Sequence, residues 1–279
     1  SVKTLMNSLY DGQNIYFNYD EIRLEGARLK TMGGRASGPA PLIKLHDFLR
    51  ETMHNAQGRK LTPLEAHDIC NQIAEIVVVG GVRRSSQISL SDLDDQEMRH
   101  AKDWPYPIKR AMANNSAIYR EKPTAAEFLQ EWGSLAQSGT GERGIFNLEA
   151  AQSKAPSRRY APLIQGTNPC GEIMLRDMEF CNLSEVVVRP EDDLDSLLDK
   201  VETAAWLGVI QSSFTDFPYL RKQWKKNCDT ECLLGVSLTG QMDNPSVLSS
   251  EALAALKSRV IRIARKASGV LGTKMPVAT

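Results

Sequence analysis

The stretch TNPCGEIMLRDMEFCNLSE, residues 167–185, places an amide, a thiol and a carboxylate at alternate positions, as Asn168, Cys170 and Glu172. If the segment is extended, these three side chains point to one face of the chain. The proline and the glycine between them disfavour a helix and a regular paired strand, which favours an exposed loop or the tip of a hairpin. A second thiol, Cys181, follows eleven residues after the first.

The neighbours of Cys170 restrict its chemistry. The carboxylate of Glu172 disfavours a thiolate by like-charge repulsion, and a nucleophilic cysteine would need a histidine, none of which lies near it in sequence. A neutral thiol can still donate and accept a hydrogen atom. Glu172 is then free to act as a general base on a hydroxyl group, and Asn168 to bind a neighbouring one. Residue chemistry alone leaves both a radical or redox site and a structural loop open.

The composition is that of an ordinary globular chain of 279 residues, with 34 basic and 34 acidic side chains. This balance gives no sign of a nucleic-acid or membrane surface. The longest apolar run, IAEIVVVGGV at 73–82, is too short to span a bilayer, and no secretory signal pattern opens the chain. Five cysteines, an odd number, favour reduced thiols over a disulfide framework. We therefore expect a cytoplasmic protein.

Strand and helix patterns alternate along the chain, which predicts an α/β fold with parallel strands. Thr62 is expected to cap a helix that has Pro63 in its first turn. The expected helices are 42–56, 62–77, 124–138, 193–214 and 249–268, and the expected strands are 14–24, a buried strand at 76–81, one within 82–90 and a strand or turn at 144–151.

Two further motifs carry no functional prediction. GTGERG at 139–144 matches the spacing of a dinucleotide-binding loop, but it follows a helix instead of a strand, so a loop that ends the helix is favoured. Cys228 and Cys232 lack a second pair of cysteines or histidines nearby, which favours a structural pair over a metal site. We predict no metal ligands.

NPCGEI, followed by CNLSE, resembles the catalytic finger loop of ribonucleotide reductases, in particular the monomeric adenosylcobalamin-dependent class II enzymes that reduce triphosphates. Further segments resemble that family in the same order and extend the resemblance over nearly the whole chain. These are EIRLEGARLKTMGGRASGPAPL, VVVGGVRRSSQISLSD, ANNSA, GTGERGIFN and LLGVSLTGQMD.

The resemblance implies a role for each residue of the opening stretch. Cys170 would become a thiyl radical that abstracts the 3′ hydrogen of the ribose, and Glu172 would accept the 3′-hydroxyl proton. Asn168 would bind the sugar hydroxyls. Cys181 would be one of the two cysteines that reduce the substrate and end as a disulfide. Outside this stretch, GGVRRSS at 80–86 resembles the loop that links a specificity effector to the substrate base.

In that loop Gly80, Gly81 and Arg83 would make the contacts, and glycines allow close approach of the backbone to a base. The implied fold is a ten-stranded α/β barrel with a central finger loop, of which residues 1–279 would form a single incomplete catalytic domain. The implied cofactor is adenosylcobalamin, and the implied partners are a ribonucleotide substrate, a deoxynucleotide effector and a thioredoxin-like dithiol.

The chain starts without Met and stops where an apolar run begins, so we expect an internal fragment that is inactive in isolation. The second reducing cysteine and the turn that binds substrate phosphates would then lie outside it. Two alternatives stay open: a nucleotide-binding remnant without chemistry, and a class I type reductase that needs a separate radical-generating subunit. The short spacing from Cys170 to Cys181 argues against the latter.

Overall fold

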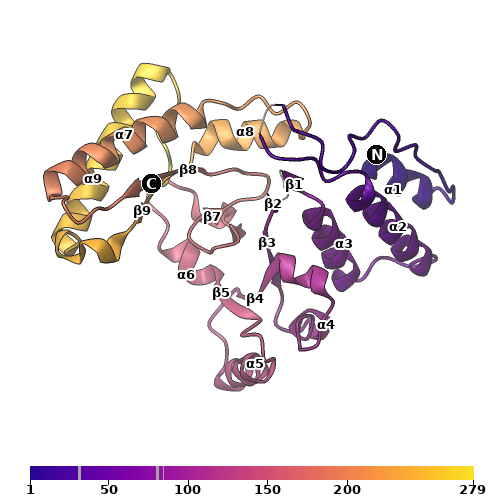
Figure 1. The fold of residues 1–279 in the computed structure, drawn as a ribbon. Helices are drawn as coiled ribbons and strands as arrows, with labels where there is room; N and C mark the ends of the chain where they lie inside the picture. Colours follow the sequence, from indigo (N-terminus) through magenta and orange to yellow (C-terminus); the bar gives the residue numbers. More distant parts are fainter. Residues whose placement is uncertain (31–32, 80–81, 84) are drawn as a thin grey trace. The chain divides into compact units, whose positions relative to one another are not determined.

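Parallel strands connected through helices occur in both compact units of the chain, residues 1–147 and 148–279 (Figure 1). The computed structural model describes all residues except 31–32, 80–81 and 84. The predicted α/β class with parallel strands is confirmed for these residues. Among them, no helix is both long and apolar enough to cross a membrane.

The first unit combines a cluster of helices with a three-stranded parallel sheet in the order β3-β4-β5. Two shorter strands pair antiparallel, Val78 opposite Arg83. The helices are α1 (Val2–Tyr10), α2 (Ala40–Asn55), α3 (Pro63–Glu75), α4 (Gln96–Arg99) and α5 (Ala125–Gln137), with a 3-10 helix η1 (Ile108–Met112). The strands are β1 (Val78–Val79), β2 (Val82–Arg83), β3 (Gln87–Ser91), β4 (Ala113–Tyr119) and β5 (Gly144–Asn147).

Helix α3 begins as its sequence predicts. The Thr62 hydroxyl accepts a hydrogen bond from the Glu65 N–H at 3.2 Å, and the Glu65 carboxylate accepts one from the Thr62 N–H at 2.9 Å. Pro63 occupies the first helical position, where no N–H is needed. The predicted cap and first turn are therefore confirmed.

The strand expected at 14–24 is wrong: this segment is a loop. Its apolar alternation is explained by packing against α2. Phe17 lies with its ring centroid 4.6 Å from that of the buried His46, and the Tyr19 hydroxyl is 2.7 Å from His46 Nδ1. The alternate side chains find a helix instead of a neighbouring strand. Of the strand expected at 76–81, Val78 and Val79 form β1, residues 76–77 lie outside a strand, and residues 80–81 lie outside the described residues.

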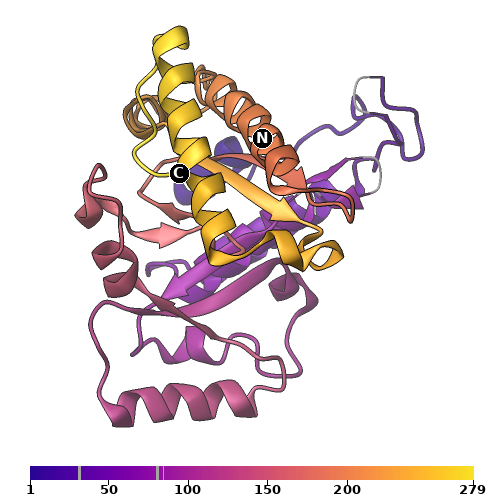
Figure 2. The same cartoon turned by 90° about the vertical axis from the view of Figure 1, so that its left-hand side faces the viewer.

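The second unit contains a hairpin, a two-stranded parallel sheet and two long helices that pack together (Figure 2). Its helices are α6 (Leu148–Ser153), α7 (Leu194–Ser212), α8 (Lys222–Glu231) and α9 (Ser250–Leu271), with 3-10 helices η2 (Ala161–Leu163), η3 (Gln241–Asp243) and η4 (Pro245–Val247). Its strands are β6 (Gly166–Thr167), β7 (Met174–Leu175), β8 (Asn182–Val187) and β9 (Leu234–Thr239). The sequence patterns predicted α7 and α9, but not α8 and β9.

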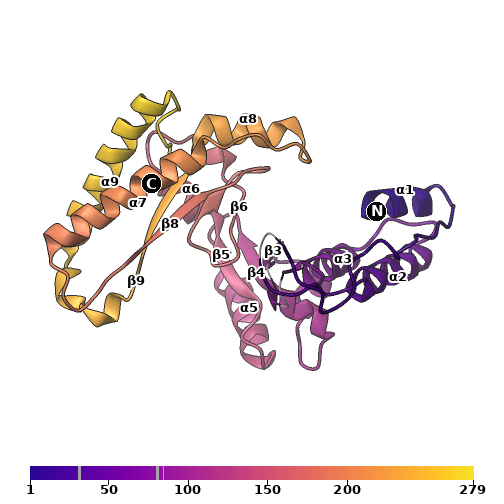
Figure 3. The same ribbon diagram turned by 45° about the horizontal axis from the view of Figure 1, so that its top comes forward.

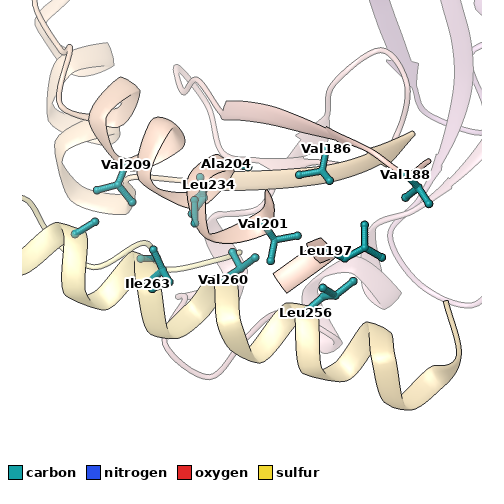
Figure 4. Packing of buried hydrophobic residues seen from close by; sticks show 13 residues of the cluster. Val186, Val188, Leu197, Val201, Ala204, Val209, Leu234, Leu256, Val260 and Ile263 are labelled. Atoms are coloured by element: carbon teal, nitrogen blue, oxygen red, sulfur yellow. The ribbon is translucent and has the colours of Figure 1, made fainter. Parts of the chain in front are cut away.

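The core of this unit lies between one face of the β8-β9 sheet and the helices α7 and α9 (Figure 4). The buried positions recur at three and four along both helices, as an amphipathic helix requires. The cluster comprises Val186, Val188, Leu197, Val201, Ala204, Ala205, Val209, Leu234, Leu256, Val260, Ile263, Ala264 and Ala267. Strands β8 and β9 run side by side in full register (Figure 3), with Asn182 opposite Leu234 and Val187 opposite Thr239. The packing of this core thus fixes the start of β8.

Truncation in this core should destabilise the second unit. Leu197 on α7 is fully buried, and we expect Leu197→Ala to lower the free energy of unfolding by about 2–5 kcal/mol through lost burial and a residual cavity. Leu207→Ala on the same helix, where the side chain is 59% exposed, is the matched control and should cost less than about 1 kcal/mol. Urea denaturation followed by circular dichroism measures both. Equal losses would show that α7 does not pack as described.

Candidate active site

Asn168, Cys170 and Glu172 lie in the connection of the β6-β7 hairpin, in which Gly166 pairs with Leu175 and Thr167 with Met174. A tight turn spans residues 168–171, where the Gly171 N–H donates to the Asn168 carbonyl at 3.0 Å. Its second position is a proline, which suits a turn, and Gly171 has φ +86°. The segment is therefore a turn, not an extended stretch, and the expected hairpin tip is confirmed.

Asn168 organises this tip through its side chain. Its Oδ1 accepts a hydrogen bond from the Ile173 N–H at 3.1 Å, and its Nδ2 donates to Glu172 Oε1 at 2.7 Å. The turn, and not the alternation of an extended strand, brings the amide and the carboxylate together. Glu172 and Cys170 are exposed, so a base and a thiol are both accessible at the tip.

Cys181 is half-buried and directly precedes β8. Its Sγ lies beside Gly235 of β9: a Cβ at this glycine would be 3.9 Å from the sulfur and would overlap Leu183 Cδ2. Burial, then the charges of Glu179 and Glu172, raise the pKa of the Cys181 thiol to about 12 against the opposing charge of Arg159.

A buried guanidinium lies behind the hairpin. Arg159 Nη1 donates to the Met174 carbonyl of β7 at 2.7 Å, while its Nη2 is 3.1 Å from Glu179 Oε2 and 2.7 Å from Glu231 Oε2 of α8. The three charged side chains are at most 3% exposed. Sequence reasoning missed all three, since single charged residues far apart in the chain look like solvated surface.

The turn between β7 and Cys181 is held by the same network and by α8. The Arg176 N–H donates to Glu179 Oε2 at 3.1 Å, and Asn227 Nδ2 donates to the carbonyls of Asp177 at 2.7 Å and Met178 at 3.2 Å. Met178 has φ +52°, a conformation that L-residues rarely adopt. The hydrogen bonds from the buried Asn227 stabilise this turn.

The remaining cysteine pair is structural in character. Cys228 on α8 and Cys232, which ends that helix with φ +46°, are both buried. Burial is the first cause that raises the pKa of both thiols. Within the part of the chain that the structure describes, no group of three or more histidine, cysteine, aspartate or glutamate side chains is arranged to hold a metal ion.

GTGERG connects α5 to β5 and anchors the first unit. Glu142 forms an ion pair with Lys102, and its second oxygen accepts a hydrogen bond from the Asn115 N–H at 3.0 Å. The buried Arg143 pairs with Glu131 of α5. The loop therefore ends a helix, as favoured from the sequence. Its two charged residues, Glu142 and Arg143, form ion pairs within the first unit.

Of the three predicted effector contacts, the structure describes Arg83. Gly80 and Gly81 lie outside the described residues. Arg83 belongs to β2, which pairs with β1 directly before the two glycines. Their role as effector contacts stays a prediction.

Curated relatives match most of the chain. No protein-family model matches the chain. It is 32% identical over 247 residues to an adenosylcobalamin-dependent ribonucleoside-triphosphate reductase of Lactobacillus acidophilus, an alignment that covers 82% of this chain and 31% of the relative. Proteins of the same name from Lactobacillus leichmannii (34% over 251 residues) and Lacticaseibacillus paracasei (35% over 232 residues) cover 83% and 80% of this chain and 31% and 30% of their own lengths.

Relatives at 32–35% identity over about four fifths of the chain show that it belongs to the ribonucleotide reductases. More narrowly, the chain is a member of the adenosylcobalamin-dependent, class II branch of that family. It spans about a third of the length of the curated relatives it matches.

The protonated state of Cys181 predicts slow alkylation with a steep dependence on pH. Only the thiolate reacts, so at pH 8 iodoacetamide should modify Cys181 on the order of a thousandfold more slowly than an unperturbed thiol of pKa about 8.5. The rate should rise about tenfold per pH unit up to pH 10. Mass spectrometry of the Cys181 peptide measures it, with the urea-unfolded chain as control. A rate that levels off below pH 10 would contradict the shielded environment.

Proposed function

We propose that this chain carries the radical-bearing finger loop and one reducing thiol of an enzyme that converts ribonucleotides to 2′-deoxyribonucleotides. The observation that carries the proposal is the tip of the β6-β7 hairpin, where the exposed Cys170 stands beside a hydrogen-bonded Asn168–Glu172 pair. It is supported by curated relatives named ribonucleoside-triphosphate reductases, which match about four fifths of the chain. The activity of the whole protein is inferred through them.

Each residue of the tip has a chemical task in this proposal. Cys170, as a thiyl radical, takes the 3′ hydrogen of the ribose, and Glu172 accepts the proton of the 3′-hydroxyl group. Asn168 already holds the Glu172 carboxylate at 2.7 Å, so it can keep the base oriented while it binds a sugar hydroxyl. A hydrogen bond that is present without substrate reduces the rearrangement needed for proton transfer.

Cys181 supplies one of the two thiols that reduce the substrate. The 2′ carbon–oxygen bond breaks, the hydroxyl group leaves as water, and two thiols become one disulfide, which releases the two electrons and two protons that the reduction requires. The 3′ hydrogen then returns to the sugar from Cys170. We place the second thiol outside these 279 residues and assign the re-reduction of the disulfide to a thioredoxin-like dithiol.

The exposure of Cys170 fits a large radical-generating cofactor, because the sulfur at the hairpin tip is accessible to a bulky group. We propose adenosylcobalamin in this role, which the names of the relatives support. When bound, it supplies a carbon-centred radical by homolysis of its cobalt–carbon bond. Cys170 is the residue of this chain that would donate its thiol hydrogen atom to that radical.

The larger assembly is part of the same proposal. The two units would belong to one ten-stranded α/β barrel with the hairpin at its centre, completed by segments outside these 279 residues. A deoxynucleotide effector would bind near Gly80, Gly81 and Arg83. We further propose a cytoplasmic enzyme whose isolated 279-residue segment does not turn over.

Replacement of Cys170 and replacement of Cys181 should have different effects on nucleotide reduction and on hydrogen exchange at the cofactor. In the full-length polypeptide with adenosylcobalamin, effector and a dithiol, Cys170→Ser should abolish both nucleotide reduction and hydrogen exchange at the 5′ carbon of the cofactor, because an O–H bond is too strong to relay the hydrogen atom. Cys181→Ser should abolish reduction but retain exchange. Tritium release and deoxynucleotide formation measure the two activities. Retained exchange in Cys170→Ser, or its complete loss in Cys181→Ser, would reverse the assignment.

Arg83→Ala tests the proposed effector loop. If this residue relays effector identity to the substrate base, its replacement should change the ratio of the four nucleotides reduced by about tenfold or more, a coupling free energy of about 1.4 kcal/mol, while cofactor exchange stays unchanged. Competition assays with mixed nucleotides measure this ratio. An equal loss for every nucleotide would count against the assignment.

A further inference from the structure

The buried carboxyl groups of Glu179 and Glu231, close to the β6-β7 hairpin, both contact one guanidinium nitrogen of Arg159. Arg159 Nη2 lies 3.1 Å from Glu179 Oε2 and 2.7 Å from Glu231 Oε2. The side chain of Glu179 is fully buried and that of Glu231 is 3% exposed. Two ionised carboxylates that contact the same nitrogen repel each other strongly when both are buried away from water.

One proton held between the two carboxyl groups would remove this repulsion. Both groups contact the same guanidinium nitrogen of Arg159, so their oxygens converge, and a protonated carboxyl group can donate a hydrogen bond to an ionised one. Among the described residues, no group donates a hydrogen bond to the buried Glu179 Oε1, which suits an oxygen that carries the proton. Burial is the first cause that raises the pKa of Glu179, and the neighbouring Glu231 raises it further.

The groups that face Glu179 come from four segments. They are Arg159 from the loop before η2, Arg176 from the turn after β7, Glu231 and Cys228 from α8, and Cys181 at the start of β8. Arg176 lies 3.5 Å from Glu231 Oε1, so it is the weaker of the two cations in contact with the pair. The charge of Glu179 reaches the thiols of both Cys181 and Cys228 and opposes their ionisation.

We propose that Glu179 is a positioning residue for Cys181: it shares one proton with Glu231 and ties the segment that leads to Cys181 onto α8. Glu179 precedes Cys181 by two residues, and its carboxyl group holds the Arg176 N–H and Arg159. A single side chain therefore links the hairpin, α8 and the thiol. The meaning of this link for nucleotide reduction rests on the proposed function of Cys181.

Infrared spectroscopy of the 279-residue chain tests for the shared proton. Exposed carboxyl groups are ionised at pH 7, so a C=O stretching band of a protonated carboxylic acid at this pH reports a buried one. We expect this band in the unmodified chain and its loss in both Glu179→Gln and Glu231→Gln. Glu191→Gln, at an exposed position, is the matched control and should retain it. Absence of the band in the unmodified chain, or its persistence in Glu179→Gln, would overturn the proposal.

The pH profile of Cys181 alkylation tests the link to the thiol. The pKa of Glu179 is about 8, so its carboxyl group holds the proton at pH 7 and is ionised at pH 10. Glu179→Gln removes that charge but keeps the size of the side chain and an oxygen for the Arg176 N–H, so at pH 10 Cys181 should react about tenfold faster, equivalent to a change of about one pKa unit. A purely structural role would leave the profile unchanged, and an unchanged profile in the folded variant would overturn the proposal. Circular dichroism reports folding, and Glu231→Gln provides the infrared test from α8 if Glu179→Gln does not fold.

Neither measurement requires catalytic activity. A chain with the shared proton and the shifted alkylation profile, in a polypeptide that fails to reduce nucleotides, would refute the proposed function and leave this inference standing. An active enzyme without the infrared band would refute this inference and leave the proposed function standing.

Discussion

The contacts of the Arg159 guanidinium fix the candidate active site. This side chain connects β7, the turn before β8, and the end of α8 through the Met174 carbonyl, Glu179 and Glu231. Removal of one partner from a buried ion pair typically costs about 3–5 kcal/mol, because the other charge is left unpaired. The base of the hairpin that carries Cys170 is thus held by a buried ion pair whose loss is costly, while Cys170 at its tip is exposed.

Rigid support and an exposed tip suit a group that must be presented to another molecule. Asn168 closes the tip with two hydrogen bonds, and the Met178 turn behind it is held by Asn227. Reactive groups perform best when packing and hydrogen bonds lock their supports. Here the supports are polar, which suits a hairpin whose β6-β7 ladder pairs only two residues from each strand.

The second thiol depends on a different part of the fold. Cys181 stands at the start of β8, whose opposite face packs onto α7 and α9, so the apolar core sets its position. Gly235 on the neighbouring strand leaves space for its sulfur and for Leu183. Burial and two carboxylates keep the thiol protonated, whereas Cys170 is exposed. Two thiols eleven residues apart thus occupy different environments, one exposed and one half-buried.

Features set by neighbouring residues were predictable from the sequence. The Thr62 cap, the periodic helices α7 and α9, the parallel α/β class, and the hairpin tip at Pro169 and Gly171 all follow from hydrogen bonds, dihedral angles and apolar spacing within a few residues. The proximity of Asn168 and Glu172 also arises locally, although a turn produces it and not strand alternation.

Only the tertiary structure decided the features whose partners lie far away in the chain. The residues of the 14–24 segment look like a strand but pack against His46, because alternating apolar residues suit a helical surface as well as a sheet. Helix α8 carries few apolar residues and is stabilised by buried polar contacts. Arg159 contacts Glu231, which lies 72 residues further along the chain. No local pattern distinguishes such a charge from one on the surface, because its burial depends on long-range packing.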